Sequence, residues 1–533
     1  MSSSTQPKKR QFQSIKGVRD ILPSETALWN HIENTAHEVF ATFCFREIRL
    51  PVMENIELFA RSVGEESDIV TKEMFSFEEY GWTPLDTFRR NIISSNPIDY
   101  RKVSLTIAVD SVKSHTDRFL TALNEAVELG EIQKTPEVIA ALQGIPKQRD
   151  ELLQALQCGP NEWSDSDLGV PWNEIRRLAR DTRLGEQLCL RPEATASVVR
   201  AYIEHGMHTL PGNVKLYCMG PMFRRERPQK GRYRQFYQID AEVLGPSDAP
   251  GIDAELIEML MVYFERVQLQ GATLYINSIG DKNCRPAYVE RLRGELQNVR
   301  DKLGPDSQRR IETNPLRVLD SKVEGEQAII EKLPRIAEHL CTDCRAHYDE
   351  VKRQLGLRGI AFQENWRLVR GLDYYMRTTF EITAPGLGSQ NAVCGGGRYD
   401  GLVEMLGGPA ATKGIGFAIG TDRLVLSLQE AGADLSVRQS GLDVYIAWFG
   451  AAAQTMAIGL ARRLRDAGFV VELPAAEMKF GKALGFADRL KARHAVILGE
   501  DEVAAGVVTV KRLADAKQQK LTEPELNAYL RSQ

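Results

Sequence analysis

Residues 223–236 constrain the fold more than any other segment of this 533-residue sequence. Strand-like runs flank this segment on both sides, and Pro228 and Gly231 stand at turn positions, so we predict a β-hairpin with a basic loop. Arginine side chains bind phosphate through two parallel hydrogen bonds, and an aromatic ring can stack on a base. A solvated charge run is the alternative, and the apolar flanks argue against it. The side chains concerned are Arg224, Arg225, Glu226, Arg227, Lys230, Arg232, Tyr233, Arg234 and Phe236.

A second polar group interrupts an apolar run at residues 368–375, which we predict to be a strand. Arg370, Asp373, Tyr374 and Tyr375 stand among Leu and Val side chains. A buried charge is expensive unless it is paired, so one interpretation is a structural ion pair beneath tyrosines. The other is a binding site that needs a cation and a phenol hydroxyl at fixed positions.

Two further patterns are weaker when taken alone. Residues 395–401 and 414–423 are rich in glycine, which permits tight turns or the close approach of a ligand to the backbone. No G-x-x-x-x-G-K-[ST] pattern occurs, so ATP, if bound, is not held by a P-loop. Glu193 and Thr195, two residues apart after a strand, can accept hydrogen bonds from an ammonium group or can cap a helix.

Composition limits the classes of protein to which this chain can belong. Hydrophobic residues make up 43% and charged residues 26% of the chain, which is typical of a globular protein, and the net charge of −4 confines RNA binding to local basic patches. The polar start has no apolar core of a signal peptide, and the eight cysteines are scattered, so we expect a reducing, cytoplasmic location without a membrane. Cys341 and Cys344 form one C-x-x-C pair without a second, which we interpret as chance placement on a helical turn, with no metal site.

The order of patterns predicts the domain organisation. Residues 80–187 are helical and charged, residues 284–363 are again helical, and short apolar strands alternate with helices after residue 443. The predicted parts are a disordered tail (1–13), a catalytic domain in three pieces (14–79, 188–283 and 364–431), helical insertions (80–187 and 284–363), a linker (432–442) and a C-terminal α/β domain (443–533).

The polar segments, in this order, resemble the class II aminoacyl-tRNA synthetases, and specifically the histidyl enzymes. Residues 368–375 are similar to the histidine-recognition signature of that family, and Arg224 with its loop resembles motif 2. Residues 416–423 resemble motif 3, residues 49–51 the dimerisation motif 1, and residues 16–20 the N-terminal opening. The resemblance implies an α+β catalytic domain built on an antiparallel sheet, helical insertions, and a C-terminal α/β domain that binds the anticodon.

The same resemblance implies the reaction and the residues that perform it. Histidine and ATP would form histidyl-adenylate and pyrophosphate, and histidine would then pass to the 3′ end of its tRNA in a homodimeric enzyme. Mg²⁺ would bind with ATP. The implied histidine-binding residues are Glu193, Thr195, Gln238, Glu242, Tyr374 and Tyr375. The implied catalytic arginines are Arg224 and Arg370, the other ATP-binding residues are Glu226 and Arg423, and the acceptor end of the tRNA would contact Arg227 and Gln229.

Three alternatives remain open on sequence alone. They are a synthetase-like regulatory subunit of ATP phosphoribosyltransferase, a tRNA-sensing protein without activity, and a class II enzyme for glycine, threonine or proline. The presence of Arg224, Arg370 and Arg423 together with the C-terminal domain disfavours the first two, and the signature at residues 368–375 with Glu242 disfavours the third. Block 80–187 departs from the family, which has a short hairpin there, and Asp240 adds a charge near the predicted imidazole site.

Overall fold

The computed structural model describes residues 12–64, 67, 69–78, 84–94, 105–129, 132, 134–157, 165–182, 187–370, 372, 374–387, 391–431 and 441–532. Several sequence predictions lie outside these residues: most of the tail 1–13 and of the linker 432–442, and residues Cys158, Gly371 and Asp373. The chain divides into two compact units, one of Met1–Asp20 and Glu33–Gly432 and the other of Ile21–Ile32 and Ala433–Gln533. No helix within the described ranges combines the length and the apolar character that a bilayer span requires.

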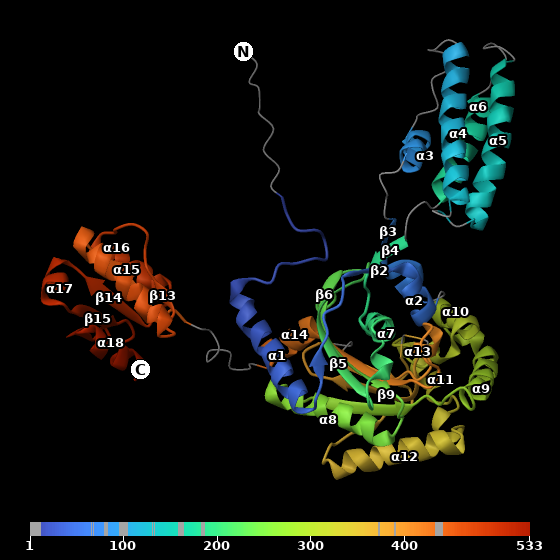
Figure 1. Cartoon of the computed structure of the whole chain (residues 1–533). Helices are drawn as coiled ribbons and strands as arrows, with labels where there is room; N and C mark the ends of the chain where they lie inside the picture. Colours follow the sequence, from blue (N-terminus) through green and yellow to red (C-terminus); the bar gives the residue numbers. More distant parts are fainter. Residues whose placement is uncertain are drawn as a thin grey trace. The chain divides into compact units, whose positions relative to one another are not determined.

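An eight-stranded sheet organises the larger unit (Figure 1), with the strand order β1-β5-β6-β11-β10-β9-β7-β8. The six inner strands pair antiparallel, whereas β1 and β8 join the edges in parallel, which confirms the predicted antiparallel catalytic sheet. The strands are β1 (Arg46–Glu47), β5 (Val214–Phe223), β6 (Gln235–Gly245), β7 (Thr273–Ser278), β8 (Gln363–Glu364), β9 (Met376–Thr383), β10 (Ala392–Arg398) and β11 (Lys413–Gly420).

Helices cover one face of this sheet. Phe40 of α1 (Pro23–Thr42) packs its ring against Phe417 of β11 and against Tyr263 of α8 (Pro250–Arg266), with ring centroids 6.0 and 5.7 Å apart. Helix α12 (Thr342–Leu357) packs beside α8. Because successive residues of a strand point to opposite faces, Gly416 and Ala418 lie on the other face of the sheet, where the cavity described below opens.

A second, smaller sheet and several helices complete the larger unit. A three-stranded sheet joins β2 (Met53–Asn55), β4 (Gln187–Leu190) and β3 (Phe75–Glu78), with β4 in the middle. Helices α2 (Ile56–Val63), α7 (Thr195–Glu204), α13 (Leu402–Met405) and α14 (Thr421–Glu430) complete the unit around the two sheets. The pairing of β1 ends at Glu47, two residues before the segment 49–51 that resembles motif 1.

The described residues between β3 and β4 form the helices α3 (Pro84–Ser94), α4 (Leu105–Glu128), α5 (Pro136–Gln157) and α6 (Asp165–Asp181). They share a hydrophobic core of their own, which includes Phe119, Leu123 and Ile175. Thr135 caps α5, because its Oγ1 accepts a hydrogen bond from the amide of Val138 at 3.3 Å. Pro171 lies inside α6, six residues after the start of that helix, although a proline usually stands in the first turn.

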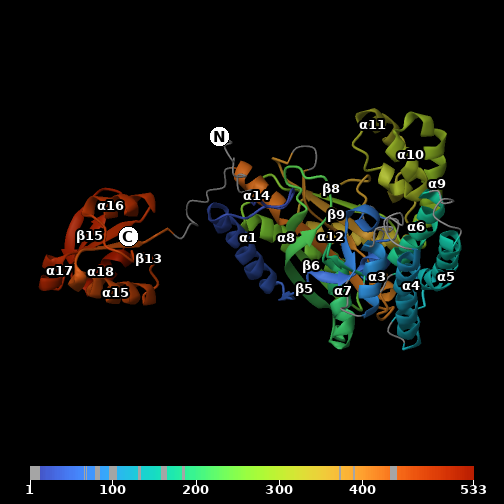
Figure 2. The ribbon, with the colours of Figure 1, turned by 90° about the horizontal axis from the view of Figure 1, so that it is seen from above.

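The segment between β7 and β8 is helical, as predicted. Figure 2 shows α9 (Arg285–Asn298), α10 (Pro305–Thr313) and α11 (Glu324–Ile330) gathered in one group. Their buried residues, among them Leu292, Ile311 and Ile330, belong to the same core as Val198 of α7 and Tyr399 after β10. This packing fixes the group against the sheet, although the domain boundaries themselves remain predictions.

The smaller unit is a five-stranded mixed sheet with the order β13-β12-β14-β15-β16. Strand β12 (Val444–Trp448) runs parallel to β13 (Val471–Glu472) and β14 (His494–Leu498), and β15 (Val508–Arg512) is antiparallel to β14 and to β16 (Gln518–Leu521). The helices are α15 (Ala451–Asp466), α16 (Phe480–Arg489), α17 (Glu500–Ala505) and α18 (Glu523–Arg531). The predicted small α/β domain with a parallel or mixed sheet is therefore confirmed.

Candidate active site

A cavity of about 330 Å³ opens on the sheet face opposite α8, and the alternation of β6 builds its floor. Gln238 and Asp240 point into it, and Glu242 lies one step further along the same face. The neighbouring strand β11 places Gly420, Ala418 and Gly416 directly opposite these three residues. Small side chains on β11 leave the space that a bound molecule needs.

Glu242 lies beneath the cavity rather than in its wall, and both of its carboxylate oxygens are engaged. The Thr195 hydroxyl donates to Oε1 at 2.6 Å, and the Tyr399 hydroxyl donates to Oε2. Burial raises the pKa of Glu242 to about 8, and the charge of Glu193 adds to the rise while the two hydroxyl contacts oppose it. Gly416 is required at this position, since a Cβ there would lie 1.5 Å from Oε2.

Two more carboxylates line the same end of the cavity. Glu193 accepts hydrogen bonds from the amides of Thr195 and Ala196 at 2.8 and 2.9 Å, so it caps α7 while facing the cavity. Burial raises its pKa, and these amides oppose the rise. Asp240 is 1% exposed, and its Oδ2 has no hydrogen-bond partner among the described residues. Burial, followed by the charge of Glu242, raises the pKa of Asp240 well above its ordinary value.

Guanidinium groups line the cavity as well. Arg370 pairs with Glu381 at 3.2 Å and lies over the ring of Tyr375, while Arg224 donates to the carbonyl of Pro192 at 2.9 Å. Arg423 donates to the carbonyl of Ala392 at 2.6 Å. All three arginines line the cavity, whose acidic end is formed by Glu193 and Asp240 above Glu242.

Tyrosine rings form the side wall near the acidic end. Tyr374 and Tyr375 have ring centroids 4.7 Å apart, and Tyr374 meets Tyr399 edge-on at 5.7 Å. Burial raises the pKa of Tyr375 to about 12, so its phenol stays a hydrogen-bond donor at neutral pH. The described residues of 368–375 form a loop that leads into β9, not the strand that we predicted, because no neighbouring strand pairs with them.

The basic hairpin loop has the predicted form. The backbones of Gln229 and Arg232 exchange two hydrogen bonds around Lys230 and Gly231, whose φ of +73° explains the glycine. Arg227 and Gln229 lie outside the main cavity, in a hollow of about 490 Å³. Glu226 belongs to both, and it pairs with Arg232 at 3.2 Å.

Comparisons with known proteins decide the family. The model of the histidyl-tRNA synthetase family matches residues 166–424, and that of the anticodon binding domain matches residues 443–533. A histidine–tRNA ligase of Koribacter versatilis is 43% identical over 98% of this chain and 96% of its own length. The chain belongs to the histidyl-tRNA synthetase family. A histidine–tRNA ligase of Solibacter usitatus is 41% identical over 97% of this chain and 99% of its own length.

Solved structures of the histidyl-tRNA synthetase family agree with this fold. The apo enzyme of S. aureus has a TM-score of 0.66 at 28% identity and covers 98% of this chain and 100% of its own. The enzyme of Nostoc sp. PCC 7120, with a TM-score of 0.59 at 18% identity, covers 98% and 100% and supports the fold alone. The alignment with the Koribacter ligase covers nearly all of both chains. The Koribacter chain is therefore also long enough to contain a block like residues 80–187.

The structure gathers most of the predicted site residues of this family member in one place. Glu193, Thr195, Arg224, Glu226, Gln238, Arg370, Tyr374, Tyr375 and Arg423 line the main cavity. Glu242 lies below it, and Arg227 and Gln229 lie beside it. Sequence reasoning assigned no role to Tyr399 or Glu381, and it noted Asp240 only as an added charge. The alternation at positions 238, 240 and 242 is the signal that could have placed Asp240 in the site.

Proposed function

We propose that this chain is a histidine–tRNA ligase, which makes histidyl-adenylate from histidine and ATP and transfers histidine to its tRNA. The cavity, which both carboxylates and guanidinium groups line, carries the proposal. We assign the carboxylates to an acidic end that suits the ammonium group and the imidazole of histidine, and the arginines to a basic end that suits polyphosphate. The family membership and the anticodon-binding match support the same activity.

At the acidic end, Glu193, Thr195 and Gln238 would hold the α-ammonium group. Glu242 and Tyr375 would bind the two imidazole nitrogens, one as acceptor and one as donor, with Tyr374 beside them. Each carboxylate oxygen of Glu242 accepts one hydroxyl hydrogen bond and has a second lone pair, which would accept the imidazole N–H of histidine. A substrate without the imidazole would leave these buried groups unpaired, which is the basis of specificity.

At the basic end, Arg224 and Arg370 would flank the α-phosphate of ATP. Attack by the histidine carboxylate adds negative charge at that phosphorus, which fixed guanidinium groups stabilise. Arg423 would bind the γ-phosphate, and Glu226 the adenine. ATP would bind as its Mg²⁺ complex, and Glu381, beside Arg370 in the wall, offers the oxygen ligand that Mg²⁺ prefers. The attacking carboxylate is already ionised, so no protein base is needed.

The remaining proposed contacts concern partners. Arg227 and Gln229, in the hollow beside the cavity, would contact the acceptor end of the tRNA, and residues 443–533 would bind its anticodon. The motif at residues 49–51 would form a homodimer, and we place the enzyme in the cytoplasm.

ATP–pyrophosphate exchange with each of the twenty amino acids tests this function. We expect exchange with histidine alone. Arg370→Ala should slow the exchange by about 100-fold or more, since it removes a charge that acts in the transition state, whereas Arg309→Ala on the exposed side of α10 should not. A folded protein that exchanges with no amino acid would contradict the proposal.

A further inference from the structure

Four potential metal ligands converge at the start of α9 and α12. Asp281 and Cys284 stand just before α9, and Cys341 and Cys344 stand at the start of α12. The two pairs are far apart in sequence, yet one ligand atom from each of the four residues lies within 4.8 Å of all the others. Asp281, Cys284 and Cys344 are buried, and Cys341 is half-buried. We propose that these four residues form a closed structural site for one Zn²⁺ ion.

The spacing of the ligand atoms fits a single tetrahedral ion. With Zn–S of about 2.3 Å and Zn–O of about 2.1 Å, tetrahedral geometry separates a sulfur and an oxygen by about 3.6 Å. Cys284 Sγ lies 3.6 Å and Cys341 Sγ lies 4.0 Å from Asp281 Oδ1. Three thiolates favour zinc over magnesium or calcium, which prefer oxygen ligands, and four protein ligands leave no open position for catalysis.

The backbone forms a turn at each pair of proposed ligands, Asp281 with Cys284 and Cys341 with Cys344. Each pair spans two intervening residues and closes with a hydrogen bond: the amide of Arg285 donates to the carbonyl of Asp281 at 2.9 Å, and the amide of Arg345 donates to that of Cys341 at 3.0 Å. Gly280 has a φ of +66°, and a Cβ there would lie 2.7 Å from Cys284 Sγ. The chain therefore wraps closely around this sulfur, and only glycine fits before it.

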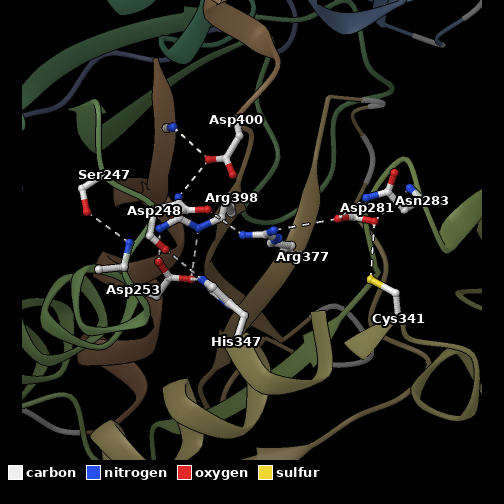
Figure 3. Close-up of polar contacts among 12 residues, drawn as sticks. Ser247, Asp248, Asp253, Asp281, Asn283, Cys341, His347, Arg377, Arg398 and Asp400 are labelled. Atoms are coloured by element: carbon white, nitrogen blue, oxygen red, sulfur yellow. Dashed lines mark hydrogen bonds and ion pairs between the residues drawn. The ribbon is translucent and has the colours of Figure 1, made fainter. Parts of the chain in front are cut away.

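The surroundings compensate the charge of a zinc–ligand cluster. Three thiolates and a carboxylate around Zn²⁺ carry a net charge of −2, and Arg377 lies 3.8 Å from Asp281 Oδ2. The N-termini of α9 and α12 each add about half a positive charge. Figure 3 shows Arg377 between Asp281 and Asp248, with the Asp281–Cys341 contact on the far side of Asp281.

The competing explanation is a redox-active Cys341–Cys344 pair. A dithiol needs two sulfurs, and it explains neither the third sulfur of Cys284 nor the carboxylate of Asp281 beside them. Zinc explains all four. It also gives the site a structural role, since it would join the first and the last helix of the segment between β7 and β8. Arg285, the first residue of α9, donates to the backbone carbonyl of Tyr375 in the cavity wall.

Metal analysis of the purified full-length chain tests the proposal. The protein is supplied with Zn²⁺, dialysed, passed through gel filtration and measured by mass spectrometry of the metal. We expect one zinc per chain, its loss in the double variant Cys341→Ser, Cys344→Ser, and its retention in Cys44→Ser, which removes an exposed thiol elsewhere. Cobalt(II) in place of zinc should give the visible absorption of a tetrahedral site and thiolate-to-metal charge transfer.

A milder variant keeps the test valid if the double variant does not fold. Asp281→Ala retains three thiolates and should lower zinc affinity by about tenfold or more in competition with a chelator. A wild-type chain that stays free of zinc and cobalt would overturn the proposal. A Cys341–Cys344 disulfide found by peptide mapping of the untreated protein would overturn it in favour of the redox pair. None of these measurements depends on enzymatic activity.

Discussion

Glu242→Gln should change how the stability of the protein depends on pH. Glu242 has a pKa of about 8, against an ordinary value of 4.5, because it is buried below the cavity. The folded chain therefore keeps a proton on this group that the unfolded chain releases between pH 4.5 and 8. Stability is fully present below pH 4.5 and falls as the pH rises through this window.

The size of the effect follows from the same pKa. Well inside the window each pH unit changes the free energy of unfolding by about 1.4 kcal/mol, and the slope halves at the folded pKa, so this group lowers it by about 2 kcal/mol between pH 6 and pH 8. Glutamine does not titrate, and its side-chain amide can meet the hydroxyls of Thr195 and Tyr399 that hold the carboxyl now. The variant should therefore lose about 2 kcal/mol less than the wild type over this range.

Urea unfolding followed by circular dichroism at pH 6, 7 and 8 measures this difference. Glu404→Gln, at an exposed position of α13, is the matched control and should follow the wild type. Parallel loss of stability in Glu242→Gln and the wild type would refute the reasoning, since it would mean that the buried carboxyl is ionised throughout.

Three further outcomes are expected. Arg398→Met should lower the free energy of unfolding by about 3–5 kcal/mol in urea titrations, because it leaves the buried carboxylates of Asp253 and Asp400 without their ion pair; a loss below about 1 kcal/mol would contradict this. Gly395→Ala should reduce pyrophosphate exchange in a folded protein, because its Cβ would lie 2.2 Å from Arg370 Nη2; unchanged exchange would show that Arg370 can shift freely. Deletion of residues 82–184 with a short turn in their place should preserve histidine activation, and complete loss in a folded variant would show that the insertion belongs to the site.

Arg398, the residue changed in the first of these variants, belongs to a buried ion-pair network that links several elements of the larger unit. Arg398 is 1% exposed and reaches Asp400 at 2.8 Å as well as Asp253 of α8. His347 of α12 lies 3.7 Å from Asp253, and its Nε2 donates a hydrogen bond to the carbonyl of Asp248 at 3.2 Å (Figure 3). These contacts connect the sheet to α8 and α12, two of the helices that cover its face.

Local patterns predicted much of the fold, because they depend on neighbours in the chain. The hairpin at residues 223–236 followed from strand-like flanks and turn residues, and the alternation after residue 443 predicted an α/β domain with a parallel or mixed sheet. Sequence reasoning missed that the described residues of 368–375 form a loop, since an apolar run has the composition of a strand whether or not a neighbouring strand pairs with it.

By itself, the sequence determined the family, the antiparallel sheet and most of the residues that line the cavity, because these are recorded in short motifs. Only the tertiary structure decided which polar groups meet. Tyr399 reaches Glu242 across a separation of 157 residues, and Asp281 meets Cys341 across 60. The pKa of Glu242 and the proposed zinc site both depend on such contacts. No local pattern encodes them, because burial and distance in space are set by how the whole sheet packs against its helices.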